Sequence, residues 1–340
     1  MLLPVFEDTP LNDLNSLRLP ASAKRYAEIH SAEQLLKLVR RGDLEGQRVV
    51  VLGGGSNVVL RGDLDAFVLH IRIPGRALVT ELDDAWIVRA GAGENWHEFV
   101  RFTLEHGWPG LENLSLIPGT VGAAPIQNVG AYGVELADRF FALEAVDLRS
   151  GQIISLDRDI CQFAYRDSLF KQQAAGRFII TAVSFRLPKQ WHAVTSYADV
   201  ANELKALGLN EPTALQVSNA VISIRSRKLP DPAVLPNAGS FFKNPVVSAA
   251  RFAELTETWP KLPYHPQHDG SIKLAAGWLI EQAGWRGRSL GRAGMYEKQA
   301  LVLVNHGGAT GEEVMRLAEC VSAAVQEKFG VTLEQEPVLL

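Results

Sequence analysis

The segment LENLSLIPGTVGAAPIQNVGAYG, residues 111–133, constrains this chain more than any other part of it. It is rich in Gly, Pro, Ala and Asn, and Glu112 is its one charged residue. A surface linker normally carries more charge, so we expect an ordered loop that packs against something large and uncharged. Its glycines allow close backbone approach, while Pro118 and Pro125 stiffen the path. Such a segment can cradle a pyrophosphate and lie along a flat aromatic cofactor. A buried structural loop is the alternative, and we favour the cofactor.

A second glycine run, GGGSN at 53–57, follows the β-branched stretch 49–52, which we expect to be a strand. Glycines there let backbone N–H groups approach a phosphate, and small polar side chains add donors. A tight turn after a strand explains this run equally well. Val58 stands where a GxGxxG motif needs its last glycine, and no Walker A sequence occurs. A Rossmann or P-loop site is therefore disfavoured.

Size and composition narrow the class of protein. The chain has 340 residues, a formal net charge of -4 and 47% hydrophobic residues, which suits two or three packed domains. No basic block stands out, so we expect no nucleic-acid partner. The N-terminus lacks a signal peptide, and no apolar stretch is long enough to span a bilayer. Cys161 and Cys320 lie far apart without a CxxC pair, so we expect a reducing compartment and no metal. These features are typical of a cytoplasmic enzyme or binding protein.

Hydrophobic periodicity and caps predict a mixed fold. Capping boxes at Ser31/Gln34 and Thr213/Gln216 mark two helix starts. After Pro188 the hydrophobic patterns are mostly those of helices. We therefore place a domain boundary near 190, between a β-rich α+β part and a smaller α+β part. We expect helices over 31–41, from Asn95 onward, and over 198–207, 213–226, 248–257, 274–283 and 310–328. We expect strands over 49–52, 66–71, 85–90, 140–148, 153–156, 178–187, 300–304 and 331–339.

Three further motifs carry candidate chemistry. Arg166 in YRDSLFK offers a fork that suits a carboxylate or an enolate oxygen, although a surface ion pair is the commoner role for an Arg-Asp pair. Ser240 in NAGSFFKNP has no glycine at 242, which excludes a GxSxG elbow. Without a histidine base it is a poor nucleophile, but a positioned hydroxyl can still protonate a carbanion or enolate. Glu334 and Glu336 near the chain end share one face of a strand, or are simply solvated acids.

Together these motifs resemble the UDP-N-acetylenolpyruvoylglucosamine reductase family, MurB, of type I. The resemblance runs from about Leu17 to Val338 and includes GGGSN, ENLSLIPGTVGAAPIQNVGAYG, YRDSLFK, LPNAGSFFKNP and KLAAGWLIEQAGWRG in order. It implies an α+β fold, with a p-cresol methylhydroxylase-type FAD-binding domain of two α+β lobes over 17–190. A smaller α+β substrate-binding domain over 191–340 follows it.

The resemblance also implies a role for individual residues. Arg166 would hold the substrate carboxylate and stabilise the developing enolate, Ser240 would donate the proton, and Glu336 would complete the catalytic set. The UDP-sugar would be contacted by Tyr197, Lys228, Asn244 and Gln299, of which Tyr197 would lie in a mobile segment over the substrate. FAD would be held by Gly53, Gly55, Ser56, Asn57, Pro118, Gly119, Gly122, Ala123, Asn128, Gly130, Ala131 and Tyr132.

The implied activity is an NADPH-dependent reduction of UDP-N-acetylglucosamine enolpyruvate to UDP-N-acetylmuramate by a cytoplasmic, monomeric flavoenzyme. Two alternatives differ in class. A sugar or aldonolactone oxidase would use oxygen, but it gives the YRDS and GSFFKNP segments no role. A flavin-binding protein without catalysis would be expected to have lost at least one of Arg166, Ser240 and Glu336.

Overall fold

The computed structural model describes residues 3–267 and 269–340, which form two compact units. Unit 1 contains residues 3–9, Ala23–Gly55 and Asp65–Arg227. Unit 2 contains Pro10–Ser22, Ser56–Leu64 and Lys228–Leu340. The two units are defined by which parts of the chain contact each other, and the last boundary between them falls after Arg227. The predicted domains are defined differently, by the ligand that each would bind: FAD for 17–190 and the substrate for 191–340. That assignment stays a prediction.

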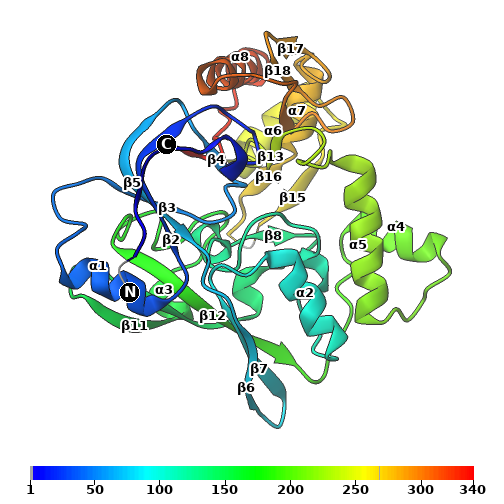
Figure 1. Ribbon diagram of the computed structural model, residues 1–340. Coiled ribbons are helices and arrows are strands. Elements are labelled where there is room, and N and C mark those ends of the chain that lie inside the picture. The colour runs from blue at the N-terminus through cyan, green and yellow to red at the C-terminus, as the bar shows by residue number, and fades with distance from the viewer. Residues whose placement is uncertain (1–2, 268) are drawn as a thin grey trace. The chain divides into compact units, whose positions relative to one another are not determined.

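Unit 1 is built mainly on a five-stranded antiparallel sheet in the order β11-β10-β12-β7-β6 (Figure 1). These strands are β6 (Arg76–Glu81), β7 (Ala85–Gly91), β10 (Phe140–Asp147), β11 (Gln152–Asp157) and β12 (Phe178–Pro188). A second sheet has the order β1-β2-β5-β3, and its edge strand β3 pairs in parallel with β5. Its strands are β1 (Phe6–Pro10), β2 (Ser22–Ile29), β3 (Val49–Leu52) and β5 (Leu64–Ile71). A short pair, β8 (Gly130–Ala131) and β9 (Val134–Glu135), lies in the glycine-rich region.

The helices of unit 1 begin where the caps predict. Ser31 and Gln34 form the expected capping box, and the Asn95 side chain accepts from the Glu98 N–H. Thr213 Oγ1 accepts from the Gln216 N–H at 3.3 Å. These helices are α1 (Ala32–Arg40), α2 (Trp96–Glu105), α3 (Arg158–Cys161), α4 (Ala198–Ala206) and α5 (Ala214–Lys228, of which Lys228 belongs to unit 2).

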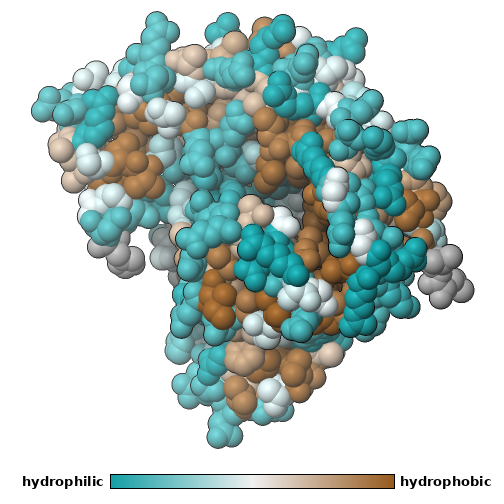
Figure 2. All heavy atoms as spheres, turned by 90° about the vertical axis from the view of Figure 1, so that its left-hand side faces the viewer, coloured by the Kyte–Doolittle hydropathy of each residue, from teal (hydrophilic) through white to brown (hydrophobic). Residues whose placement is uncertain are grey.

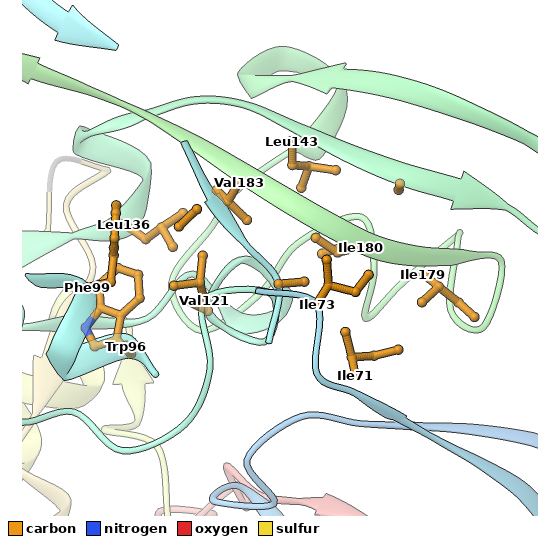
Figure 3. Packing of buried hydrophobic residues seen from close by; sticks show 14 of the residues in the cluster. Ile71, Ile73, Trp96, Phe99, Val121, Leu136, Leu143, Ile179, Ile180 and Val183 are labelled. Carbon is orange, nitrogen blue, oxygen red and sulfur yellow. The ribbon is translucent and has the colours of Figure 1, made fainter. Parts of the chain in front are cut away.

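The core of unit 1 joins the sheet, α2 and the glycine-rich segment. Trp96 and Phe99 on one face of α2 meet Phe185 of β12 with ring centroids 5.8 and 5.1 Å away. Figure 3 shows Val121 of the glycine-rich segment in the same cluster as Trp96, Phe99 and Ile73. A separate small cluster joins α4 to α5 and includes Tyr132 at its edge. Because Val121 is fully buried, the segment is a packed part of the fold and not a surface linker.

Unit 2 is a smaller α+β arrangement. Its sheets have the orders β13-β19-β18-β17 and β14-β16-β15, and β20 pairs in parallel with β4. The strands are β4 (Val58–Val59), β13 (Asn237–Ser240), β14 (Val246–Val247), β15 (Tyr264–Pro266), β16 (Ile272–Leu274), β17 (Ser289–Leu290), β18 (Ala293–Met295), β19 (Val302–Asn305) and β20 (Val338–Leu339). The helices are α6 (Ala249–Thr258), α7 (Ala276–Gln282) and α8 (Gly311–Phe329).

One predicted strand is wrong in extent. Of the expected stretch 331–339, only Val338–Leu339 is a strand, and Gln335 forms an isolated bridge with Phe242. Pro337 has no N–H to donate to a ladder, which interrupts pairing across this stretch. The predicted helix over 274–283 is also shorter, since Leu274 ends β16 and α7 begins at Ala276.

The surface is mixed in character. On the face drawn in Figure 2, hydrophilic side chains predominate and hydrophobic ones lie in separate patches among them. In the part of the chain that the structure describes, no helix combines the length and apolar character that crossing a membrane requires.

Candidate functional site

The two glycine-rich segments meet inside unit 1. A Cβ atom on Gly54 would lie 2.9 Å from the Cα of Gly119, and one on Gly53 would lie 2.6 Å from the Oγ1 of Thr120. Real Cβ atoms do not approach backbone as closely as the first of these distances, so the loop after β3 can pass Gly119 only with glycine at 54. The two runs are 61 residues apart in the sequence (57 to 118) and are both predicted to hold FAD, and the structure brings them together.

The backbone of 119–122 is held against the stretch that leads from β7 into α2. The Trp96 N–H donates to the Gly119 carbonyl at 3.1 Å, the Val121 N–H donates to the Glu94 carbonyl at 2.9 Å, and the Gly122 N–H donates to the Ala92 carbonyl at 2.9 Å. This rigid support leaves one polar atom unsatisfied. The buried hydroxyl of Thr120 has no hydrogen-bond partner among the described residues. An unpaired buried hydroxyl typically costs about 1–3 kcal/mol, so it marks a place where a polar ligand atom would be stabilised.

A buried histidine, His70, is hydrogen-bonded to the glycine loop that follows β3. His70 on β5 hydrogen-bonds to the backbone of Gly53, and its Nδ1 lies 2.7 Å from the Tyr26 hydroxyl. Burial lowers the pKa of His70, with Arg72 adding to the effect. Burial also raises the pKa of Tyr26 to about 12. The two groups are therefore neutral around pH 7 and act as hydrogen-bonding supports. Sequence reasoning missed both, because the contact joins strands that are far apart in the chain.

Arg166 clamps the second half of the glycine-rich segment. Its Nη2 donates to the Gly130 carbonyl at 2.6 Å, and its Nη1 reaches the Asn128 carbonyl at 3.4 Å. The Arg166 backbone has φ of 53°, a left-handed conformation that is uncommon for a side chain of this size. Asn128 has φ of 45° and bonds through its side chain to Glu135 and to the Ala164 carbonyl. The predicted catalytic arginine and the predicted cofactor segment are thus directly bonded to each other.

Tyr132, at the end of that segment, contacts Tyr197. The two rings meet edge to face with centroids 5.3 Å apart. The side-chain amide of Asn113 ties together the two stretches of chain that carry these rings. It donates to the Tyr132 carbonyl at 2.8 Å and to the Val194 carbonyl at 2.9 Å. Burial raises the pKa of Tyr132, so its hydroxyl stays neutral. One residue predicted for the cofactor and one predicted for the substrate therefore lie side by side.

Unit 2 brings together the other two candidate catalytic residues. Ser240 ends β13, and the next residue, Phe241, accepts at its carbonyl from the Glu336 N–H at 2.9 Å. Asn57 also hydrogen-bonds to the chain around Glu336. Its side chain donates to the Glu336 carbonyl at 3.3 Å, and its own carbonyl accepts from the Val338 N–H at 2.9 Å. The buried ring of Pro337 sits between these two bonds. Glu336 is therefore fixed in the same part of unit 2 as Ser240.

Two of the candidate substrate residues lie at the start of α7. The Asn244 Oδ1 accepts from the Ala276 N–H at 2.9 Å, and a Cβ on Gly277 would lie 2.9 Å from the Gln299 Oε1. Lys228 is exposed at the last position of α5, away from this pair in the sequence. The structure places Tyr197 and Arg166 in unit 1, and Lys228, Asn244, Gln299, Ser240 and Glu336 in unit 2.

Comparison with known proteins gives a consistent answer. Residues 23–157 match the FAD binding domain family, and residues 231–340 match the family described as UDP-N-acetylenolpyruvoylglucosamine reductase, C-terminal domain. Proteins named UDP-N-acetylenolpyruvoylglucosamine reductase from Azoarcus sp. and Dechloromonas aromatica are 59% and 56% identical, over 99% and 97% of this chain and 98% of each relative. The crystal structure of the reductase (MurB) from Thermus caldophilus matches with a TM-score of 0.68. It covers 99% of this chain and 98% of that one, and at 22% identity the likeness bears on the fold alone.

The fold match confirms the predicted α+β class, and the family match over 23–157 confirms an FAD-binding domain. The two relatives match nearly the whole chain at 59% and 56% identity, which shows the family as well as the fold. The chain belongs to the UDP-N-acetylenolpyruvoylglucosamine reductase (MurB) family.

Proposed function

We propose that this chain reduces UDP-N-acetylglucosamine enolpyruvate to UDP-N-acetylmuramate with NADPH, a step in making peptidoglycan precursor. The observation that carries the proposal is the 59% identity to a named reductase over 99% of this chain. The candidate groups support it, because an enolpyruvyl group needs its carboxylate bound and a proton delivered to one carbon. Arg166 and Ser240 supply those two functions.

FAD is the cofactor, and the residues of unit 1 suit it. The FAD binding domain match spans 23–157, which includes both glycine-rich segments. Within it, the Thr120 hydroxyl is buried without a partner among the described residues, so it is available to a polar atom of the cofactor. When bound, FAD supplies hydride transfer between NADPH and the enolpyruvyl group. The residues proposed to hold it are those of 53–57 and 118–132 named above.

Arg166 is proposed to bind the substrate carboxylate. A guanidinium presents its donors in a planar fork that matches a carboxylate, and it keeps its charge at any working pH. Charge that develops on the carboxylate as an enolate would be stabilised by this preorganised group. Its bond to the Gly130 carbonyl ties the same side chain to the cofactor segment.

Ser240 is proposed to protonate the carbon next to the carboxylate, after hydride has reached the methylene carbon. The hydroxyl gives up its proton to that carbon and is restored from solvent, so one hydride and one proton saturate the double bond. Glu336, held by the bonds to Phe241 and Asn57, is proposed to stabilise the enolate form through a hydrogen bond. Tyr197, Lys228, Asn244 and Gln299 are proposed to contact the UDP-sugar.

The wider setting is part of the same proposal. FAD is assigned to 17–190 and the UDP-sugar to 191–340. The enzyme is proposed to act as a monomer in the cytoplasm, where NADPH is available, with no nucleic-acid or membrane partner. The absence of a strongly basic block and the mild net charge of -4 support the lack of a nucleic-acid partner.

An anaerobic flavin experiment tests the function. Bound FAD is reduced with NADPH, UDP-N-acetylglucosamine enolpyruvate is added, and the visible flavin absorbance is followed. Prompt recovery of the oxidised spectrum together with the lactyl product supports the proposal, and a spectrum that recovers only in air indicates an oxidase. Ser240→Ala should keep flavin reduction by NADPH and slow reoxidation by about 100–1000-fold. Half-buried Ser271→Ala, which removes a hydroxyl that donates to Asp269, serves as the control. Reoxidation of Ser240→Ala at the wild-type rate would exclude Ser240 as the proton donor.

A further inference from the structure

Arg225 is a cationic side chain that the proposed chemistry does not use. It lies on α5, and its Nε is buried without a hydrogen-bond partner among the described residues. The residue as a whole is half-buried. A buried N–H left unpaired typically costs about 1–3 kcal/mol, and more when the group is charged. Because no group of the described chain pairs with this N–H, a bound ligand is the natural candidate for its hydrogen-bond acceptor.

The helix carries Arg225 to the glycine-rich segment. Ser218 lies seven residues earlier, on the same face of α5, and its hydroxyl hydrogen-bonds to the hydroxyl of Ser115 at 2.8 Å. Arg225 itself hydrogen-bonds to the Tyr132 hydroxyl. Two anchors two turns apart therefore lay this face of α5 along residues 115–132. Every residue in these contacts belongs to unit 1.

Among the residues that the structure describes, none brings a negative charge to Arg225. The interactions that favour its charged form come from the Tyr132 hydroxyl, and no carboxylate of the described chain contributes, while burial lowers the pKa of Arg225. Tyr132 cannot supply the charge, since burial raises its pKa. His97 interacts electrostatically with Arg225, and burial together with the charges of Arg101 and Arg225 lowers the pKa of His97. Its Nδ1 accepts from the Leu116 N–H at 3.0 Å, which leaves its other nitrogen as a donor. Arg225 and His97 therefore present hydrogen-bond donors and a positive charge, which suit an acceptor that carries negative charge.

We propose that Arg225 is a further cofactor-binding residue, whose guanidinium pairs with an electron-rich, negatively charged group of FAD. This rests on the proposed function only in taking FAD as the ligand. FAD has two such groups, the diphosphate, which is always charged, and the N1–C2=O edge of the isoalloxazine ring, which gains charge when the ring is reduced. Both are recognised by the same chemistry, because a guanidinium fork forms charge-assisted hydrogen bonds with either.

Equilibrium FAD binding to the apoprotein tests this without turnover. Arg225→Gln keeps polar hydrogen-bonding atoms and removes the charge, and we expect its dissociation constant for FAD to rise about 10- to 100-fold, the range for losing a hydrogen bond to a charged group. Arg227→Gln is the matched control. It removes an arginine two residues along α5 that is exposed and pairs with Glu203, so FAD binding should stay at the wild-type level.

The midpoint potential of the bound flavin distinguishes the two groups of FAD. If the diphosphate is the partner, Arg225→Gln weakens binding of oxidised and reduced FAD equally and the potential does not move. If the ring edge is the partner, reduced FAD is weakened more and the potential falls. A dissociation constant and a potential that both match those of Arg227→Gln would overturn the proposal.

A second variant guards against misfolding. Arg225→Lys keeps the charge but loses the planar fork, and we expect a smaller loss of affinity, about 3- to 10-fold, with circular dichroism unchanged. FAD affinity at the wild-type level in this variant, together with an Arg225→Gln protein that does not fold, would assign Arg225 to structure and overturn the proposal. Wild-type protein that binds FAD but is not reoxidised by the enolpyruvate would contradict the proposed function and leave the test of Arg225 intact.

Discussion

At the scale of single residues, Arg166 shows how conformation and role are joined. Its φ of 53° lies in a region that few large side chains occupy, and its fork bonds to the carbonyls of Gly130 and Asn128. Strain of this kind typically costs about 1–3 kcal/mol and persists where the surroundings enforce it. The bonds to the carbonyls are such an enforcement, and they fix the guanidinium beside the cofactor segment before any ligand arrives.

Arg166→Lys should therefore impair more than charge. The lysine ammonium is a point charge on a flexible stem, so it cannot hold two carbonyls and a carboxylate in one plane. We expect kcat/KM for the enolpyruvate to fall about 100-fold or more, as steady-state kinetics would measure, while the anaerobic rate of flavin reduction by NADPH changes far less. Arg139→Lys is the control, since Arg139 also donates to backbone carbonyls, those of Gly110 and Asp138, outside the candidate site. Equal losses in both variants would mean that Arg166 acts only through the backbone.

At the scale of elements, the ends of β10 and β12 depend on one ion pair. Asp147 closes β10, and its carboxylate accepts from Arg177 Nε at 3.1 Å and Nη2 at 2.8 Å, just before β12 begins. The Asp147 side chain is only 5% exposed. The hydrogen bond from Arg177 holds the pKa of Asp147 at about 2, below its usual value of 3.8. The charged pair therefore stabilises the end of the β10·β12 pair in the large sheet, where Asp147 lies opposite Phe178.

Asp147→Asn should lower the free energy of unfolding by about 2 kcal/mol at pH 7, from the size of the pKa shift. Because the folded pKa lies below the unfolded one, the stabilisation is complete above about pH 4. It is lost as the pH falls toward 2. Urea unfolding of wild type and variant should therefore differ at pH 7 and converge near pH 2. Asp65→Asn breaks the exposed pair with Lys24 and should change stability by under about 1 kcal/mol. A difference between wild type and Asp147→Asn that persists unchanged at low pH would contradict the argument.

Elements with a local signal could be predicted from the sequence, and those without one could not. The caps at Ser31, Asn95 and Thr213 act within three residues, and the helices that follow them begin as expected. Strands such as β14 and β17 have two residues each, too few to show an alternation, so they exist only through their partners. The stretch 331–339 is predicted to be one strand, and Pro337 prevents it from pairing throughout.

The candidate site divides in the same way. The residues with recognisable motifs, such as Arg166 and Ser240, could be named from the sequence because the motif itself points to them. Thr120, His70 and Arg225 could not, because each is defined by what it meets in space. The Thr120 hydroxyl matters because nothing pairs with it in the described chain, and His70 matters because it reaches Gly53 from another strand. No local pattern encodes such contacts.

At the scale of the whole molecule, the chain passes from one unit to the other several times. Residues 10–22 and 56–64 lie early in the sequence but belong to unit 2. Asn305 at the end of β19 makes the tie explicit. Its side-chain amide donates to the Leu17 carbonyl at 2.8 Å, across 288 positions of sequence, and its Oδ1 accepts from the N–H groups of Gly307 and Ala309 at 2.8 and 3.0 Å. Unit 2 is thus complete only when both ends of the chain are present.

Asn305→Ala should destabilise unit 2 as a whole. The side chain is buried, and its removal leaves one carbonyl and two N–H groups without their partner, so we expect a loss of about 2–4 kcal/mol in the free energy of unfolding. Urea unfolding gives the magnitude, and hydrogen exchange gives the place, with faster exchange in β13, β18 and β19 than in wild type. Exposed Asn210→Ala should stay within about 0.5 kcal/mol of wild type. Faster exchange confined to 305–309 would show that the bond to Leu17 orders only its own turn, because a tie that completes unit 2 must affect every strand of that sheet.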